Sequence, residues 1–299
     1  MTTQTITGGT GADTLAGTTD AEVINANAGN DTVTAGAGHD TINGGAGADQ
    51  IDGQDGDDLI QGGADADVIR GGAGNDTLTG RGQNDTFAFG PSDTGFDAVD
   101  GGAGNDTILA LAEGTVIGLR SAAGVETVSA NGFANVVVRG DGGNNSLNFT
   151  NAILTGITLI DGGAGNDSIT GGSSADQIRG GARNDTLSGG AGADIFRFFA
   201  AADSTRTARD VITDFDPVRG DRIDLSAIDA RSDLPGDQTF TFGGFSAAPQ
   251  RGQVTYVVFG GGTGALVVGD VNGDGVIDFQ IELIAVNGPL TLTAADFIL

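Results

Sequence analysis

Acidic residues recur at a nine-residue spacing near the start of the chain, and their carboxylates are the groups best suited to do chemistry. From Gly8 to Ala88 the sequence divides without a gap into nine-residue units, each with an acid at its sixth place. These acids are Asp13, Glu22, Asp31, Asp40, Asp49, Asp58, Asp67, Asp76 and Asp85. A regular column of carboxylates offers the oxygen ligands that a hard cation such as Ca²⁺ prefers. The spacing therefore predicts a series of metal sites.

The same pattern resumes after a three-residue slip at 89–91. A degenerate unit at 92–100 precedes GGAGNDTIL at 101–109, which contains Asp106, and a second array covers 162–197. The acids of the second array are Asp167, Asp176, Asp185 and Asp194. Asp and Gly are also favoured in solvated turns for local reasons, but that preference does not enforce a fixed phase. A common metal-binding role explains the phase better.

The units also indicate the elements that position these acids. Glycines at the first, second and fourth places permit the positive φ angles and close backbone approach of a tight turn, and the last three places predict a short strand. The eighth place is always apolar, from Leu15 to Phe87, which predicts a thin aliphatic core. Between the arrays, β-branched runs such as 136–139 and 157–160 predict solenoid strands without metal turns.

The unit GGxGxDxUx resembles the calcium-binding nonapeptide of RTX, or hemolysin-type, proteins. The resemblance implies an all-β fold, a parallel β-roll or β-solenoid. With two units per coil, each acid lies one strand spacing, about 4.8 Å, from its equivalent 18 residues later. Because stacked carboxylates repel, we expect Ca²⁺ to bind them together with turn carbonyls, so that folding and binding are one event.

The 18-residue spacing predicts which acids share an ion. The pairs are Asp13–Asp31, Asp31–Asp49, Asp49–Asp67, Asp67–Asp85, Glu22–Asp40, Asp40–Asp58, Asp58–Asp76, Asp167–Asp185 and Asp176–Asp194. Glu22 is longer than Asp, and Thr18, Thr19 and Asp20 replace the usual turn before it. We therefore expect poor occupancy at Glu22.

A different composition begins near Phe196. The segments FRFFAAADSTRTARDVITDFDPVRGDRIDLSAIDA, GDVNGDGVIDFQIEL and LTAADFIL resemble the C-terminal domain of serralysin-type metalloproteases. That resemblance implies a β-rich cap and type I secretion through an uncleaved C-terminal signal, for which Asp296–Leu299 is a candidate and an ordinary final strand the alternative. The expected domains are a first RTX array (1–109), solenoid rungs without calcium turns (110–161), a second array (162–197) and a cap with the secretion region (198–299).

A second type of calcium loop is suggested by Asp270, Asn272, Asp274 and Asp278, which follow the start of the EF-hand pattern. The twelfth place is Ile281 instead of the bidentate Glu, and helical flanks are not expected. A glycine-rich hairpin turn is the competing interpretation.

Composition excludes several functions. A net charge of -27 disfavours nucleic acid and anionic membrane surfaces as partners. The chain contains no cysteine, and its single histidine, His39, rules out a zinc helix H-E-x-x-H and is expected to be exposed in a turn. No G-x-S-x-G nucleophile motif occurs, so we expect no enzymatic activity. The first residues lack the charged and apolar regions of a cleaved signal peptide.

These features predict a secreted calcium-binding β-roll that folds outside the cell, free or associated with the cell surface. Its expected partners are several calcium ions and the type I secretion apparatus, without nucleic acid or membrane insertion, and with self-association or a cell-surface partner left open. Two alternatives remain: an S-layer-like or matrix component, and a stand-alone secretion or chaperone module for a separate hydrolase. Calcium-dependent assembly on cells would favour the first, and co-purification with a hydrolase the second.

Overall fold

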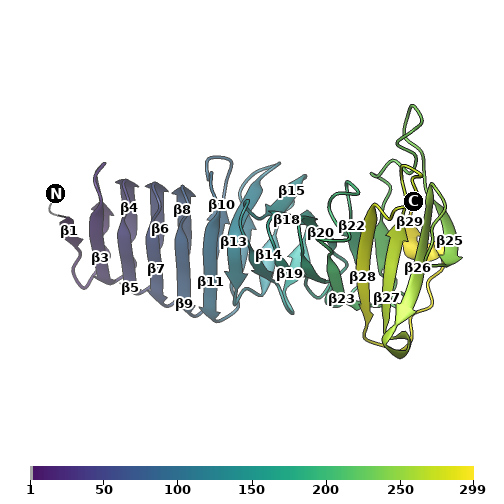
Figure 1. Cartoon of the computed structure of the whole chain (residues 1–299). Helices are drawn as coiled ribbons and strands as arrows, with labels where there is room; N and C mark the ends of the chain where they lie inside the picture. The colour runs from purple at the N-terminus through teal and green to yellow at the C-terminus, as the bar shows by residue number, and fades with distance from the viewer. Residues whose placement is uncertain (1–2) are drawn as a thin grey trace. The chain divides into compact units, whose positions relative to one another are not determined.

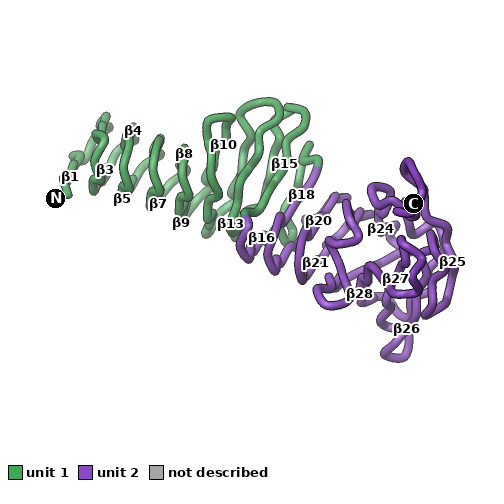
Figure 2. The backbone as a smooth tube through the Cα atoms, turned by 45° about the horizontal axis from the view of Figure 1, so that its top comes forward, with its two compact units in different colours: residues 1–141, 147–158 green, residues 142–146, 159–299 purple. Residues whose placement is uncertain are grey.

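Short β-strands make up nearly all of the regular structure in the computed structural model, which describes residues 3–299 (Figure 1). Within these residues the helical elements are two 3₁₀ turns, η1 (Gly260–Gly262) and η2 (Ala294–Asp296). The chain forms two compact units: unit 1 contains residues 1–141 and 147–158, and unit 2 contains 142–146 and 159–299 (Figure 2). Residues 1 and 2 of the N-terminal segment lie outside the described part. The predicted all-β fold is confirmed.

Unit 1 consists of two stacks of parallel strands. One stack runs β2 (Thr14–Ala16), β4 (Thr32–Ala37), β6 (Gln50–Asp55), β8 (Val68–Ala73), β10 (Thr86–Phe89), β12 (Thr107–Ala110), β14 (Thr127–Ser129) and β17 (Ile153–Thr155). The other runs β1 (Gln4–Thr7), β3 (Glu22–Ala28), β5 (Thr41–Ala46), β7 (Leu59–Ala64), β9 (Thr77–Gly82), β11 (Asp97–Ala103), β13 (Val116–Ala123) and β15 (Val136–Arg139). The chain alternates between the stacks, as expected of a parallel β-roll.

The register of the strands follows the repeat. Thr32 pairs with Gln50 and Gln50 with Val68, so one coil contains two units, as predicted. After the three-residue slip the offset grows accordingly, and Thr86 pairs with Thr107. The strands are longer than the predicted three residues, since β4 to β9 each contain six. Each begins at the seventh place of one unit and ends at the third place of the next.

The thin core is the predicted apolar column. The side chains of Ile24, Val33, Ile42, Ile51, Ile60, Ile69, Leu78 and Phe87 are all at least 97% buried. Leu15, in the first coil, is only half-buried, contrary to its expected place in the core. Each eighth-place residue stacks on its equivalent in the next coil, as Ile51 pairs with Ile69. Burial of this column is the main apolar contribution to the stability of unit 1.

Unit 2 contains the second array, and parallel pairing continues beyond it. One stack runs β19 (Ser168–Thr170), β21 (Thr186–Ser188), β23 (Val211–Phe215) and β28 (Phe279–Ala285). The other runs β18 (Ile157–Ala164), β20 (Gln177–Ala182), β22 (Ile195–Arg197), β24 (Arg222–Asp224) and β29 (Phe297–Ile298). The remaining strands are β16 (Ser146–Asn148), at the boundary of the units, β25 (Thr241–Phe245), β26 (Gln253–Phe259) and β27 (Gly264–Gly269). Strands β26, β27 and β28 pair antiparallel.

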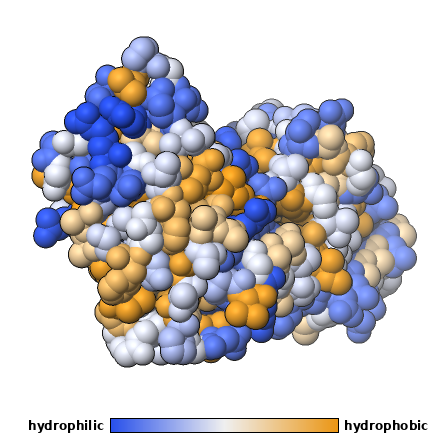
Figure 3. Space-filling model, turned by 90° about the vertical axis from the view of Figure 1, so that its right-hand side faces the viewer, coloured by the Kyte–Doolittle hydropathy of each residue, from blue (hydrophilic) through white to orange (hydrophobic). Residues whose placement is uncertain are grey.

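Several large apolar side chains of unit 2 remain at its surface. Val218 is 92% exposed and Phe245 67% exposed, and Val276 and Val286 are also exposed. On the face shown in Figure 3, apolar patches are interrupted by hydrophilic side chains. This face is therefore mixed in character and not uniformly polar.

Candidate metal centre

The repeat aspartates lie in the turns, one residue before each strand begins, and Glu22 is the first residue of β3. Asp40 precedes β5 and Asp49 precedes β6, and both carboxylates are 1% exposed. The turn is shaped by glycines at the second and fourth places, such as Gly45 (φ 109°) and Gly47 (φ 116°). The first-place glycine, for example Gly44, has no positive φ and instead allows the close approach of neighbouring atoms.

Each carboxylate is tied to the coil before it by one oxygen. The main-chain N–H of Asp31 donates to Oδ1 of Asp49 at 2.8 Å, and the N–H of Asp49 donates to Oδ1 of Asp67 at 2.8 Å. The same bond joins every pair predicted from the 18-residue spacing. The structure thus brings the predicted pairs together, while their role as ligands remains a prediction.

The second carboxylate oxygen of most of these residues is buried without a hydrogen-bond partner among the described residues. This is true of Oδ2 in Asp31, Asp40, Asp49, Asp58, Asp67, Asp76, Asp85, Asp106, Asp185 and Asp210. A buried, unpartnered carboxylate oxygen is costly. Because the same unpartnered Oδ2 atom recurs in coil after coil, we infer that a bound ligand, and not another group of the protein, interacts with it.

First-place glycines pack directly against several of these oxygens, although Asp31 and Asp40 have Ala26 and Ala35 at that place. A Cβ atom on Gly44 would lie 2.5 Å from Oδ2 of Asp49 and 2.5 Å from the carbonyl oxygen of Gly62. At Gly53 the corresponding distances to Asp58 Oδ2 and the Gly71 carbonyl oxygen are 2.4 and 2.5 Å. A carboxylate oxygen and a carbonyl oxygen of the next coil therefore converge on one space. Oxygen donors of these two kinds fit Ca²⁺.

Side-chain ligands alone do not complete such a site. Within residues 3–299, no group of three or more His, Cys, Asp or Glu side chains is placed to hold a metal ion. At most two carboxylates, from successive coils, would face one ion, and turn carbonyls would supply the other oxygens. The glycines are therefore as important as the acids for such a site, because they shape the turns whose carbonyl groups would be ligands.

Burial perturbs the carboxylates strongly. Desolvation, reinforced by the charges of Asp49 and Asp85, raises the pKa of Asp67 to about 7. Desolvation likewise raises the pKa of Asp58 to about 6 and of Asp185 to about 7. The protein alone thus disfavours ionisation of the column near neutral pH, and a bound cation would reverse that preference.

The hydrogen-bonded columns include residues beyond the predicted acids, and of these only Asp97 is at the sixth place of a nine-residue unit, the degenerate unit 92–100. Asp76 N–H donates to Asp97, Asp106 to Glu126, Asn145 to Asp167, Asp185 to Asp210 and Asp194 to Asp221. Their separations are 20 to 27 residues, because the intervening loops are longer. A local signal was present: each new member, like a repeat acid, stands two residues before a buried apolar side chain, as Asp210 does before Ile212.

Three of the predicted acids have partners within the chain for the second oxygen. Thr18 donates to the Glu22 carboxylate from its main-chain nitrogen at 3.0 Å and from its hydroxyl at 2.5 Å. Gly9 and Gly172 donate their N–H groups to Oδ2 of Asp13 and Asp176, respectively. These carboxylates are the least in need of an additional ligand.

A second ladder, formed by fifth-place side chains, stabilises the outer turns. Oδ1 of Asn30 accepts the N–H of Ala48 at 3.1 Å, and Nδ1 of the exposed His39 accepts the N–H of Asp57 at 2.9 Å. The expected exposure of His39 is confirmed. With Nδ1 as acceptor, His39 is a turn-stabilising residue in this structure.

The EF-hand-like segment is the connection between antiparallel strands β27 and β28. Its carboxylates accept hydrogen bonds inside the loop: Asp270 from Gly273 and Gly275, and Asp278 from Val271 and Asn272. Main-chain N–H groups also reach the side chains of Asn272 and Asp274. The segment has the topology of the alternative hairpin turn, and its calcium binding stays a prediction.

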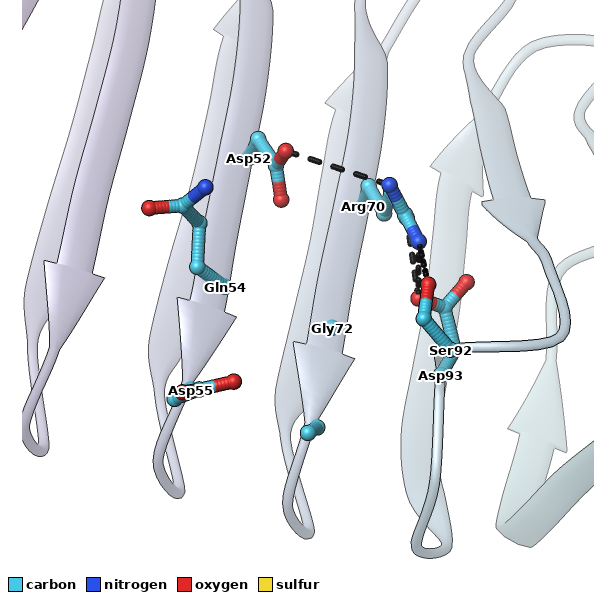
Figure 4. A pocket seen from close by; sticks show the side chains of 8 residues that line it. Asp52, Gln54, Asp55, Arg70, Gly72, Ser92 and Asp93 are labelled. Atoms are coloured by element: carbon cyan, nitrogen blue, oxygen red, sulfur yellow. Dashed lines mark hydrogen bonds and ion pairs between the residues drawn. The ribbon is translucent and has the colours of Figure 1, made fainter.

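A polar pocket of about 210 Å³ lies on unit 1 where the repeat slips. Its lining residues are Asp52, Gln54, Asp55, Arg70, Gly72, Ala73, Ser92 and Asp93. Figure 4 shows Arg70 reaching Ser92 and Asp93, with Nη2–Oδ1 of Asp93 at 2.6 Å, and Asp52 at 4.0 Å. Arg70 connects the loop after β10 to the face of the sheet. The polar residues of the pocket therefore stabilise this loop, which accounts for their presence without a ligand.

Comparisons with known proteins agree with this geometry. The family "RTX calcium-binding nonapeptide repeat" matches residues 3–33, 16–51 and 52–87, and "Peptidase M10 serralysin C terminal" matches residues 93–299. No curated protein matches the chain. Similar solved structures are two subunits of the Azotobacter vinelandii mannuronan C5-epimerase. AlgE6R2 is 31% identical (46% of this chain, 80% of that one, TM-score 0.35), and AlgE6R3 is 29% identical (50% and 69%, TM-score 0.32).

Both families correspond to the resemblances drawn from the sequence, and the second covers most of the chain. The RTX repeats are calcium-binding, in agreement with the buried oxygens of the columns. The chain belongs to the serralysin C-terminal family of peptidase M10 and carries RTX calcium-binding nonapeptide repeats in its N-terminal part.

Proposed function

We propose that this chain is an extracellular calcium-binding β-roll whose folding is completed by Ca²⁺ after export by type I secretion. The observation that carries the proposal is the row of buried Oδ2 atoms without partners, several of which, such as those of Asp49 and Asp58, lie close to a first-place glycine and to a carbonyl oxygen of the next coil. The candidate ligands are the repeat acids, joined by the column members Asp210 and Asp221. The match to the serralysin C-terminal family, which the sequence comparison associates with type I export, supports the route.

Calcium supply would act as the switch. Extracellular calcium modules bind at roughly 10⁻⁴ to 10⁻³ M, so the far lower cytosolic calcium would leave the columns without counter-charge. When bound, the ion supplies positive charge and accepts oxygen ligands. The protein positions each carboxylate through one hydrogen bond, as the N–H of Asp31 donates to Oδ1 of Asp49. The other oxygen, Oδ2, is buried away from water.

The activity we propose is binding and not catalysis. Neither matched family is a catalytic domain, and the sequence offers no zinc helix or nucleophile motif. No helix within residues 3–299 is sufficiently long and apolar to cross a bilayer. The fold and the columns support a protein whose surface and rigidity are set by calcium.

Circular dichroism with and without chelator tests this function. We expect a coil-like spectrum in chelator and β-structure when Ca²⁺ reaches the millimolar range, with Mg²⁺ at the same ionic strength as control. Mg²⁺ should be a poor substitute because it demands six short, regular bonds. A full β-spectrum in chelator would refute calcium-dependent folding.

A further inference from the structure

One carboxylate column of unit 1 ends on an arginine instead of an acid. The column reaches Asp97, whose Oδ1 accepts the N–H of Asp76 at 2.9 Å. On β13, Leu119 is the partner of Asp97 and Ser121 is the partner of Ala98, so Arg120 is an extra residue inserted between them. Bulges of this kind redirect a side chain. Where the next carboxylate of the column would be expected in this coil, the chain therefore has Arg120.

Arg120 reaches back toward the turn that contains Asp76. Its Nη2 donates to the carbonyl oxygen of Asp76 at 3.1 Å and to that of Asn75 at 3.3 Å. Its Nε is buried without a hydrogen-bond partner among the described residues. Such a position is costly for a cation unless negative charge surrounds it.

The surrounding negative charge comes from the column itself. The carboxylates of Asp97 and Asp76 are both buried, and both lie close enough to Arg120 for its charge to favour their ionised forms. Because a guanidinium remains protonated at every relevant pH, this counter-charge is permanent.

The other column of unit 1 shows the contrast. There the N–H of Asp106 donates to Oε2 of Glu126 at 2.7 Å, so the column continues with an acid where its neighbour has Arg120. The two columns reach the same stretch of the solenoid with opposite charges. At this coil, one column therefore has the carboxylate pair Asp106–Glu126, and the other has Arg120 after Asp97.

We propose that Arg120 is a built-in cation that takes the place of a calcium ion at the Asp76–Asp97 end of its column. This inference rests on the proposed function, since it assigns the counter-charge of one rung in a stack whose other rungs use calcium. Arg120 is thus a positioning residue for the carboxylates and makes this rung less dependent on calcium than its neighbours.

Calcium titrations of charge variants test the assignment. Arg120→Gln should raise the calcium concentration at half-maximal β-structure by about 1.5- to 3-fold, a modest factor because many ions bind together in one transition. Arg120→Lys, which keeps the charge, should stay near the wild type. The matched control is Arg81→Gln, which removes an exposed arginine of the same array that contacts Gln61. Equal midpoints for Arg120→Gln and Arg81→Gln would overturn the proposal.

A double variant separates charge from packing. Asp97→Asn keeps the oxygen that accepts the Asp76 N–H and removes the charge that Arg120 balances, so Arg120→Gln/Asp97→Asn should recover the wild-type midpoint. This comparison also applies where Arg120→Gln alone fails to fold, and a double variant that stays defective would contradict the proposal. Absence of calcium dependence in the wild type and in Arg81→Gln would instead refute the proposed function.

Discussion

Replacing Asp49 by Asn tests the ligand columns most sharply. Asp49 faces two coils: its Oδ1 accepts the N–H of Asp31, and its own N–H donates to Asp67. Asn keeps the Oδ1 acceptor and removes the charge, so the hydrogen bond from the Asp31 N–H is preserved. Because Asp49 belongs to two predicted ion pairs, we expect Asp49→Asn to lose about two bound ions per chain and to need more calcium for folding.

The matched control is Glu22→Gln. Glu22 belongs to one predicted pair, and Thr18 already donates to both of its carboxylate oxygens, so we expect a loss of at most one ion. Asp49→Ala adds a second, calcium-independent cost of about 1–3 kcal/mol, because it leaves the buried Asp31 N–H without an acceptor.

Calorimetric titration with calcium gives the number of ions, and urea unfolding in chelator and in calcium gives the free energy of unfolding. If the fold in chelator is too unstable for a baseline, the comparison is made across sub-saturating calcium concentrations. Equal ion counts and equal midpoints for Asp49→Asn and Glu22→Gln would refute the ligand map.

Three further outcomes follow from the same structure. Gly44→Ala should weaken calcium binding, since its Cβ would lie 2.5 Å from Asp49 Oδ2, whereas Gly11→Ala, which meets nothing within 4 Å, should not; equal titrations would contradict this. Ile60→Ala should cost about 2–5 kcal/mol of unfolding free energy in saturating calcium by urea denaturation, because the side chain is fully buried; a cost below 1 kcal/mol would not fit. In chelator the folded state should be less unfavourable at pH 5 than at pH 8, so that β-structure increases as pH falls, because carboxyls such as Asp67, with a folded pKa of about 7, stabilise the fold while protonated and lose that contribution as pH rises through this value. Calcium affinity should instead increase from pH 5 to pH 8. A calcium-free chain that gains β-structure toward pH 8 would contradict the prediction.

Much of the fold could be predicted from the sequence because its period is strict. The pairing of Thr32 with Gln50 follows from two units per coil, and the buried column of Ile51 and Ile69 follows from the eighth place. The strand length did not follow, because the glycines of the first and second places look like turn residues. In the structure they lie in strands, and Gly44 has no positive φ angle but packs closely against Asp49, since a Cβ atom there would lie 2.5 Å from Asp49 Oδ2.

The irregular part of the columns could not be predicted by counting. Asp97 is at the sixth place of the degenerate unit 92–100, whereas Asp210 follows a loop of non-standard length, so a fixed phase misses it although it precedes the buried Ile212 by two positions. Arg120 is further removed from any sequence rule, since its role depends on a bulge between β11 and β13. Such positions are set by tertiary packing, which the local pattern does not contain.

The central claim is that bound Ca²⁺ satisfies the buried carboxylate oxygens. The most direct measurement is elemental analysis of calcium in the purified protein after equilibration at millimolar Ca²⁺ and removal of free ions by rapid gel filtration. The account predicts several calcium ions per chain, released together with the loss of β-structure on addition of chelator. A folded protein that retains no calcium under these conditions would contradict it.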